Sequence, residues 1–170
     1  VLSLTGILQK IIHKIVEIDK DGKKTGWDDF NRKQLKWLYI NAKGNVLLNS
    51  AINFYLDDVF EPKEEEMSKV KNYLEKAKKF FHECEDLILP KVETHTNLAT
   101  TYLYLSELDK AREYCENAIG QNPSYEYAYF RLAQCWEKQK NRKKVLEVID
   151  RFKGEIRISH FKELAKRYKR

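Results

Sequence analysis

The chain has 170 residues, 42% of them hydrophobic, and 32 Lys and Arg against 26 Asp and Glu give it a net charge of +6. This length and apolar content suffice to bury one core, or one short array of repeats, without cross-links. Three cysteines are an odd number, which excludes a complete disulfide framework and favours buried, reduced thiols. No apolar run approaches the roughly 20 residues of a membrane span, and no signal-peptide pattern is seen. We therefore expect a soluble protein of the cytoplasm or the nucleus.

Residues 1–26 are predicted to be an N-terminal segment or linker that precedes a helical body. Within this segment Ile11, Val16 and Ile18 have a spacing that suits a strand. The charged stretch after them, up to Trp27, suits a linker.

The rest of the chain is predicted to be all-α, because it contains few glycines and prolines and its apolar residues recur at helical spacing. Pro62, Pro90 and Pro123 mark breaks between antiparallel helices. Helices are expected at residues 30–60, 64–89, 91–105, 108–120, 125–139 and 142–153.

A basic C-terminal helix is predicted at residues 154–170. Residues 138–170 carry thirteen Lys and Arg against four Asp and Glu, so the basic character of the chain is concentrated there. Phe161, Leu164 and Tyr168 lie at helical spacing between cations, which favours a helix that caps the last element of the body.

A pattern of small and large residues repeats along the body at residues 27–153. Counted from Val92, one unit matches the 34-residue tetratricopeptide pattern at Leu98, Ala99, Tyr102, Ala111, Ala118 and Pro123. The small residues allow the two helices of the unit to approach closely, and proline ends the second helix. A weaker copy begins at Glu126. Ala77, Phe81 and Cys84 belong to the second helix of an earlier copy, and its first helix is expected to cross that second helix at Gly44. We therefore expect about three antiparallel helix pairs with a long first hairpin.

The stretches "KGN" (43–45), "NLATTYLYLSELDKAREYCENAI" (97–119) and "YAYFRLAQCWEKQKN" (127–141) resemble the tetratricopeptide half of FKBP-type immunophilins. The resemblance extends from Trp27 to about Arg170. It implies that residues 1–26 hold the last strand of a preceding FKBP-like domain and its linker. A prefix of this length is too short for the FKBP fold, so we expect no isomerase site in this chain.

The resemblance implies a concave groove that grips the C-terminal carboxylates of heat-shock chaperones. The groove residues that match the family are Asn45, Asn97 and Arg131, while Asn41 and Tyr127 stand where the family has lysines. Loss of two cations should weaken a carboxylate clamp, since charge-assisted hydrogen bonds are the strong ones. We also expect Tyr104, Tyr125 and Tyr127 to reach the concave face.

The predicted function is a non-catalytic protein-interaction module, an adaptor or co-chaperone that binds a peptide segment in this groove. The alternative is a regulatory scaffold that holds a client such as a protein kinase, or self-associates, independently of chaperone tails. No nucleophile, paired-carboxylate or phosphate-loop motif indicates an enzyme, and we expect neither a metal nor a cofactor.

The basic C-terminal helix suggests one further candidate partner. The resemblance implies that a helix in this place can bind calmodulin, as basic amphipathic helices do in general, although we favour the capping role. Neither a nucleic acid nor a membrane is expected, because no motif or aromatic platform for them is present.

Overall fold

The computed structural model describes residues 29–56, 64–87 and 91–169, which form seven helices and no strand. The predicted all-α class is therefore confirmed for this part of the chain. None of the described helices is both long and apolar enough to cross a bilayer. The strand predicted around Ile11 to Ile18, and the rest of segment 1–26, lie outside the described residues.

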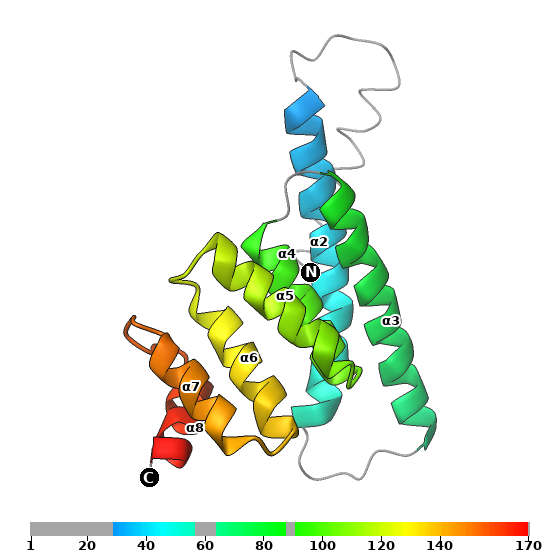
Figure 1. Ribbon diagram of the computed structural model, residues 1–170. Helices are drawn as coiled ribbons and strands as arrows, with labels where there is room; N and C mark the ends of the chain where they lie inside the picture. Colours follow the sequence, from blue (N-terminus) through cyan, green and yellow to red (C-terminus); the bar gives the residue numbers. More distant parts are fainter. Residues whose placement is uncertain (1–28, 57–63, 88–90, 170) are drawn as a thin grey trace, which may run out of the picture. The chain divides into compact units, whose positions relative to one another are not determined.

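The described helices separate into two compact units, with the boundary after Pro90. The first unit holds α2 (Asp29–Leu56) and α3 (Glu64–Leu87). The second holds α4 (Val92–Tyr104), α5 (Leu108–Gln121), α6 (Glu126–Lys138), α7 (Arg142–Arg151) and α8 (Ser159–Lys169) (Figure 1). The domain boundaries predicted at residues 26 and 153 stay predictions.

In the first unit α2 and α3 pack against each other as antiparallel helices. Near one end Trp37 and Cys84 belong to one buried cluster, and the Cys84 thiol donates to the Trp37 carbonyl at 3.9 Å. Further along, Gly44 lies against the ring of Phe81. The absence of a side chain at Gly44 lets the helices approach closely, as the sequence predicts.

The second unit contains two helix pairs built on the same spacing. Helices α4 and α6 begin 34 residues apart, at Val92 and Glu126, and α5 and α7 begin 34 residues apart as well. The turns inside the two pairs also correspond, because Ser106 and Lys140 both have left-handed backbones, with φ of 63° and 56°. The weaker copy predicted from Glu126 thus has the same fold as the first.

The core of the second unit combines small residues at the helix crossings with large ones between them. Ala99, Ala118 and Ala133 are fully buried, together with Leu132 and Ile149. Aromatic rings extend this core toward the C-terminus. Ring centroids lie 5.0 Å apart for Tyr129 and Phe152, 5.8 Å for Phe130 and Phe161, and 6.2 Å for Phe152 and Phe161.

Helix α8 covers the end of this core, because Phe161, Leu164 and Ala165 are buried on one of its faces. The segment before it is not helical. Its backbone N–H groups at Arg157 and Ile158 both donate to the Glu126 carboxylate at 2.8 Å, which holds the approach to α8 against α6.

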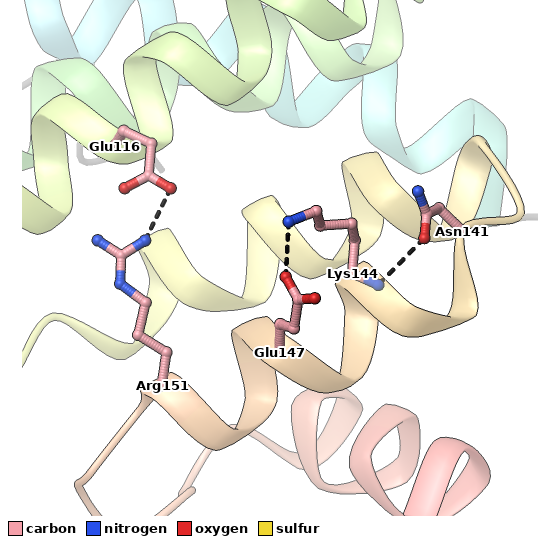
Figure 2. Close-up of polar contacts among 5 residues, drawn as sticks. All are labelled: Glu116, Asn141, Lys144, Glu147 and Arg151. Carbon is pink, nitrogen blue, oxygen red and sulfur yellow. Dashed lines mark hydrogen bonds and ion pairs between the residues drawn. The ribbon is translucent and has the colours of Figure 1, made fainter.

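Polar contacts on the surface of the second unit fix α7 in place (Figure 2). The Asn141 side chain accepts a hydrogen bond from the Lys144 backbone N–H at 3.1 Å, which caps the first turn of α7. Arg151, in the last turn, pairs with Glu116 of α5 at 2.8 Å. The Arg151 and Glu116 side chains are about half exposed, so their ion pair contributes little to stability and serves mainly to orient α7 against α5.

Candidate peptide-binding surface

Helix α6 carries a stripe of polar and aromatic side chains on one face. Tyr127, Arg131, Gln134 and Lys138 are spaced by four, three and four residues, which places them along one side of the helix. Tyr127 is 49% exposed, whereas Leu132 and Ala133, between stripe positions, are buried in the core. We call these four residues the α6 stripe.

Arg131 is a half-buried cation in the middle of the stripe. Its Nη1 donates to the amide oxygen of Gln134 at 2.8 Å, and its Cζ lies 5.1 Å from the ring centroid of Phe130. Its Nε is buried and has no hydrogen-bond partner among the described residues. Burial lowers the pKa of Arg131, and the phenol of Tyr104 is the largest influence that raises it. The guanidinium is thus desolvated, and its one hydrogen bond within the described part of the chain is to a neutral amide.

Lys138, at the C-terminal end of the stripe, reaches across to α4. Its Nζ donates to the carbonyl of Leu103 at 3.0 Å and lies 5.8 Å from the ring centroid of Tyr104. Burial lowers the pKa of Lys138. The phenol of Tyr104 also raises the pKa of Arg131, so it acts electrostatically on both cations of the stripe.

The N-terminal end of the stripe is aromatic. The rings of Tyr125 and Tyr127 lie 6.0 Å apart at 41°. Burial raises the pKa of Tyr125, and Glu93 of α4 and the phenol of Tyr127 raise it further. This end therefore offers ring surface, while the middle and the far end offer positive charge.

A known pattern fits this arrangement of helices. Residues 92–125 match the tetratricopeptide repeat. The match covers α4, α5 and the turn before α6, and repeats of this family mediate protein–protein interactions. A comparison of the chain with curated proteins found no significant match. The immunophilin type of the domain stays a proposal.

The tetratricopeptide spacing puts Asn97 of α4 at the position that corresponds to Arg131 of α6. Asn97 is half-buried, and its backbone carbonyl accepts a hydrogen bond from the Thr101 hydroxyl at 2.8 Å. Helices α4 and α6 contact each other. The second unit therefore places Tyr127 and Arg131 on one face of α6, with Asn97 and Tyr104 on the adjacent helix α4.

Asn41 and Asn45 lie one turn apart on α2, in the first unit, and both are half-buried. The groove predicted to unite them with Arg131 would need residues from both units, so it stays a prediction. Among the described residues no cluster of His, Cys, Asp and Glu is suited to hold a metal ion.

Sequence reasoning overlooked two members of the α6 stripe, Gln134 and Lys138. The available signal was their spacing from Arg131, three and seven residues, which helical periodicity places on the same face. Lys138 also occupies the repeat position that corresponds to Tyr104, which had been singled out. These two residues extend the candidate surface along the whole of α6.

Proposed function

We propose that this chain is a protein-interaction module of the tetratricopeptide type that binds an acidic peptide segment along the α6 stripe. It would act as an adaptor or co-chaperone similar to the tetratricopeptide half of FKBP-type immunophilins. One observation carries the proposal. Arg131 is a desolvated cation whose Nε has no partner among the described residues and whose contacts are neutral.

A cation in this state is better suited to receive an anion than to stabilise the fold alone. Burying a charge costs free energy unless a counter-charge or full hydrogen bonding compensates it. A carboxylate at Arg131 would supply both, because guanidinium and carboxylate groups match each other with two parallel hydrogen bonds. Peptide binding would thus restore a compensation that the described part of the free chain lacks.

The expected affinity is lower than that of a complete carboxylate clamp. Asn41 and Tyr127 are neutral at positions where the resembled family has lysines, so two charge-assisted contacts are missing. The ligand is therefore a chaperone tail held weakly, or another acidic segment whose aromatic or apolar side chain packs on Tyr125 and Tyr127.

The test is calorimetric titration with Met-Glu-Glu-Val-Asp, with a free or an amidated C-terminus. We expect binding in the micromolar range that is lost on amidation and falls at least tenfold in Arg131→Ala. Arg157→Ala is the matched control, because the Arg157 side chain is 81% exposed and pairs only with its neighbour Glu155 in the described structure.

Circular dichroism of each variant checks that helicity is unchanged. Equal binding by wild type and Arg131→Ala would contradict the role of Arg131. Absence of binding to either peptide would reject the chaperone tail as ligand.

The second candidate function is a scaffold that assembles through its basic C-terminal helix. On α8 Lys162 and Lys166 are exposed on one side and form no ion pair within the described residues. Such a face suits an acidic client surface, such as that of a kinase, or another copy of the chain. Sedimentation velocity at low and high salt tests self-association, and Lys162→Glu with Lys166→Glu should abolish any salt-sensitive assembly.

A further inference from the structure

We infer that Lys138 is the second anchor of the α6 stripe, and that the ligand is an extended peptide whose two acidic groups are three residues apart. One acidic group would contact Arg131 and the other Lys138. This inference rests on the proposed function and deepens it, because it names a specificity-determining residue and the acidic spacing that it selects.

The spacing follows from the geometry of the two backbones. Arg131 and Lys138 are seven residues apart on one face of α6, which corresponds to about 10.5 Å along the helix axis. A peptide in the extended polyproline II conformation advances by about 3.1 Å per residue with three residues per turn, so side chains three residues apart lie on the same side, about 9.3 Å from each other. Two carboxylates at positions i and i+3 of the peptide therefore match the two cations, and adjacent carboxylates do not.

Lys138 has donor capacity left for a ligand. Its ammonium group has three N–H donors, and the described structure uses one of them for the Leu103 carbonyl. That bond holds the side chain against α4, so less conformational entropy is lost when a carboxylate binds. The same partial burial that lowers its pKa makes an incoming anion more favourable.

Two acidic side chains of the second unit are already paired with cations. Glu137 pairs with Arg167 at 3.0 Å, and Asp109 pairs with Arg112, whose guanidinium lies 4.3 Å from the ring centroid of Trp136. In the described part of the chain neither Arg131 nor Lys138 forms an ion pair with a carboxylate. The positive charge of the stripe is thus left to a ligand.

Tyr104 adds a preference for the kind of peptide residue that lies between the two acidic residues. Its ring centroid lies 5.8 Å from Lys138 Nζ, and its phenol raises the pKa of Arg131. It ends α4 beside the Leu103 carbonyl that holds Lys138. A small apolar residue of the peptide would pack on this ring between the two charge contacts. Apolar contact here adds affinity without competing for the cations.

The experiment is a double-mutant cycle with three peptides, Met-Glu-Glu-Val-Asp, Met-Gln-Glu-Val-Asp and Met-Glu-Gln-Val-Asp. The first substituted peptide lacks the acid three residues before the terminal Asp, and the second lacks the acid two residues before it. We expect the first to bind about tenfold more weakly than the parent, and the second to bind within about twofold of it.

The protein variants are Lys138→Gln, Lys138→Arg and the matched control Lys143→Gln, an exposed lysine of α7. Lys138→Gln should bind the parent about tenfold more weakly and should lose the distinction between the parent and Met-Gln-Glu-Val-Asp. Lys138→Arg should keep that distinction, and Lys143→Gln should behave as wild type. A role limited to holding α4 would weaken all peptides by the same factor.

The outcomes separate the two proposals. If Arg131→Ala weakens binding but Lys138→Gln affects all three peptides equally or not at all, this inference is overturned and the proposed function stands. If wild type binds none of the peptides, the chaperone-like acidic ligand is rejected, and the inference with it. Coupling between Lys138 and the first glutamate alone supports the inference.

Discussion

Gly44 is the residue on which the close packing of α2 and α3 depends. A Cβ built at this position would lie 2.5 Å from Cε1 of Phe81, whose side chain is fully buried. We expect Gly44→Ala to lower the free energy of unfolding by about 1–3 kcal/mol, because the ring has no room to move away. Urea denaturation followed by circular dichroism measures the change.

Gly120 provides the matched control, since it lies near the end of α5 and a Cβ built there would have open space around it, with only its own helix backbone nearby. Gly120→Ala should leave stability unchanged or raise it by up to about 1 kcal/mol, because alanine is the better helix former. Similar losses in the two variants would show that helix propensity, and not the crossing at Gly44, governs the result.

Cys84 makes the stability of the first unit depend on alkaline pH. Burial, followed by the charges of Glu83 and Glu85, raises the pKa of this thiol from 9.0 to about 12. A group whose pKa is raised by folding contributes stability that is full below the unfolded pKa. That contribution falls as pH rises from about 9 toward 12, because only the unfolded chain loses the proton.

We therefore expect wild type to lose more stability than Cys84→Ala between about pH 8.5 and pH 10.5. Denaturation midpoints under reducing conditions, measured at each pH, give the two slopes. Because only slopes are compared, the constant loss from the shortened side chain cancels. Parallel slopes would mean that the thiol ionises equally in the folded and unfolded chain.

The candidate site was predictable from sequence only in part. Arg131 and Asn97 are predicted from the resemblance to the immunophilin family, and both lie on the first helices of their pairs. Lys138 was missed because its contact with the Leu103 carbonyl joins residues 35 positions apart, which no local pattern encodes. The burial that lowers the pKa of Arg131 was not predictable either, since burial depends on how the helices pack.

At the scale of elements, spacing predicted the helices well and their ends less well. The helix expected at residues 142–153 ends at Arg151, and Phe152 is extended, with φ of −72° and ψ of 115°. This backbone places the Phe152 ring between Tyr129 and Phe161. The C-terminal helix starts at Ser159, because residues before it are held by Glu126. The end of α7 and the start of α8 are both determined by tertiary contacts, which helical periodicity in the sequence does not predict.

Phe161 is the main attachment of α8 to the second unit. It is fully buried and contacts the rings of Phe130 and Phe152. We expect Phe161→Ala to destabilise the second unit by about 3–5 kcal/mol and to raise hydrogen exchange throughout α8. The exposed neighbour His160 is the control, and His160→Ala should change stability by less than about 0.5 kcal/mol. Equal exchange in α8 of the two variants would argue against this anchoring role.

At the scale of the whole molecule, the second unit has a core of its own. Among the residues that the structure describes, its buried cluster is formed by residues between the start of α4 and the end of α8. We expect residues 91–170, produced alone, to be helical and to unfold in one cooperative transition, since chains of this length support a core. Circular dichroism during urea denaturation tests this. Strong binding of a dye specific for exposed apolar surface, without a cooperative transition, would contradict it.

The 34-residue spacing has a consequence for building with this chain. Because α4–α5 and α6–α7 follow one period, an extra copy of residues 92–125 inserted after Tyr125 would present the same faces to both neighbours. The inserted pair would lengthen the second unit and leave α8 at its end. The length of the ligand-binding surface could thus be increased by one helix pair with each inserted repeat.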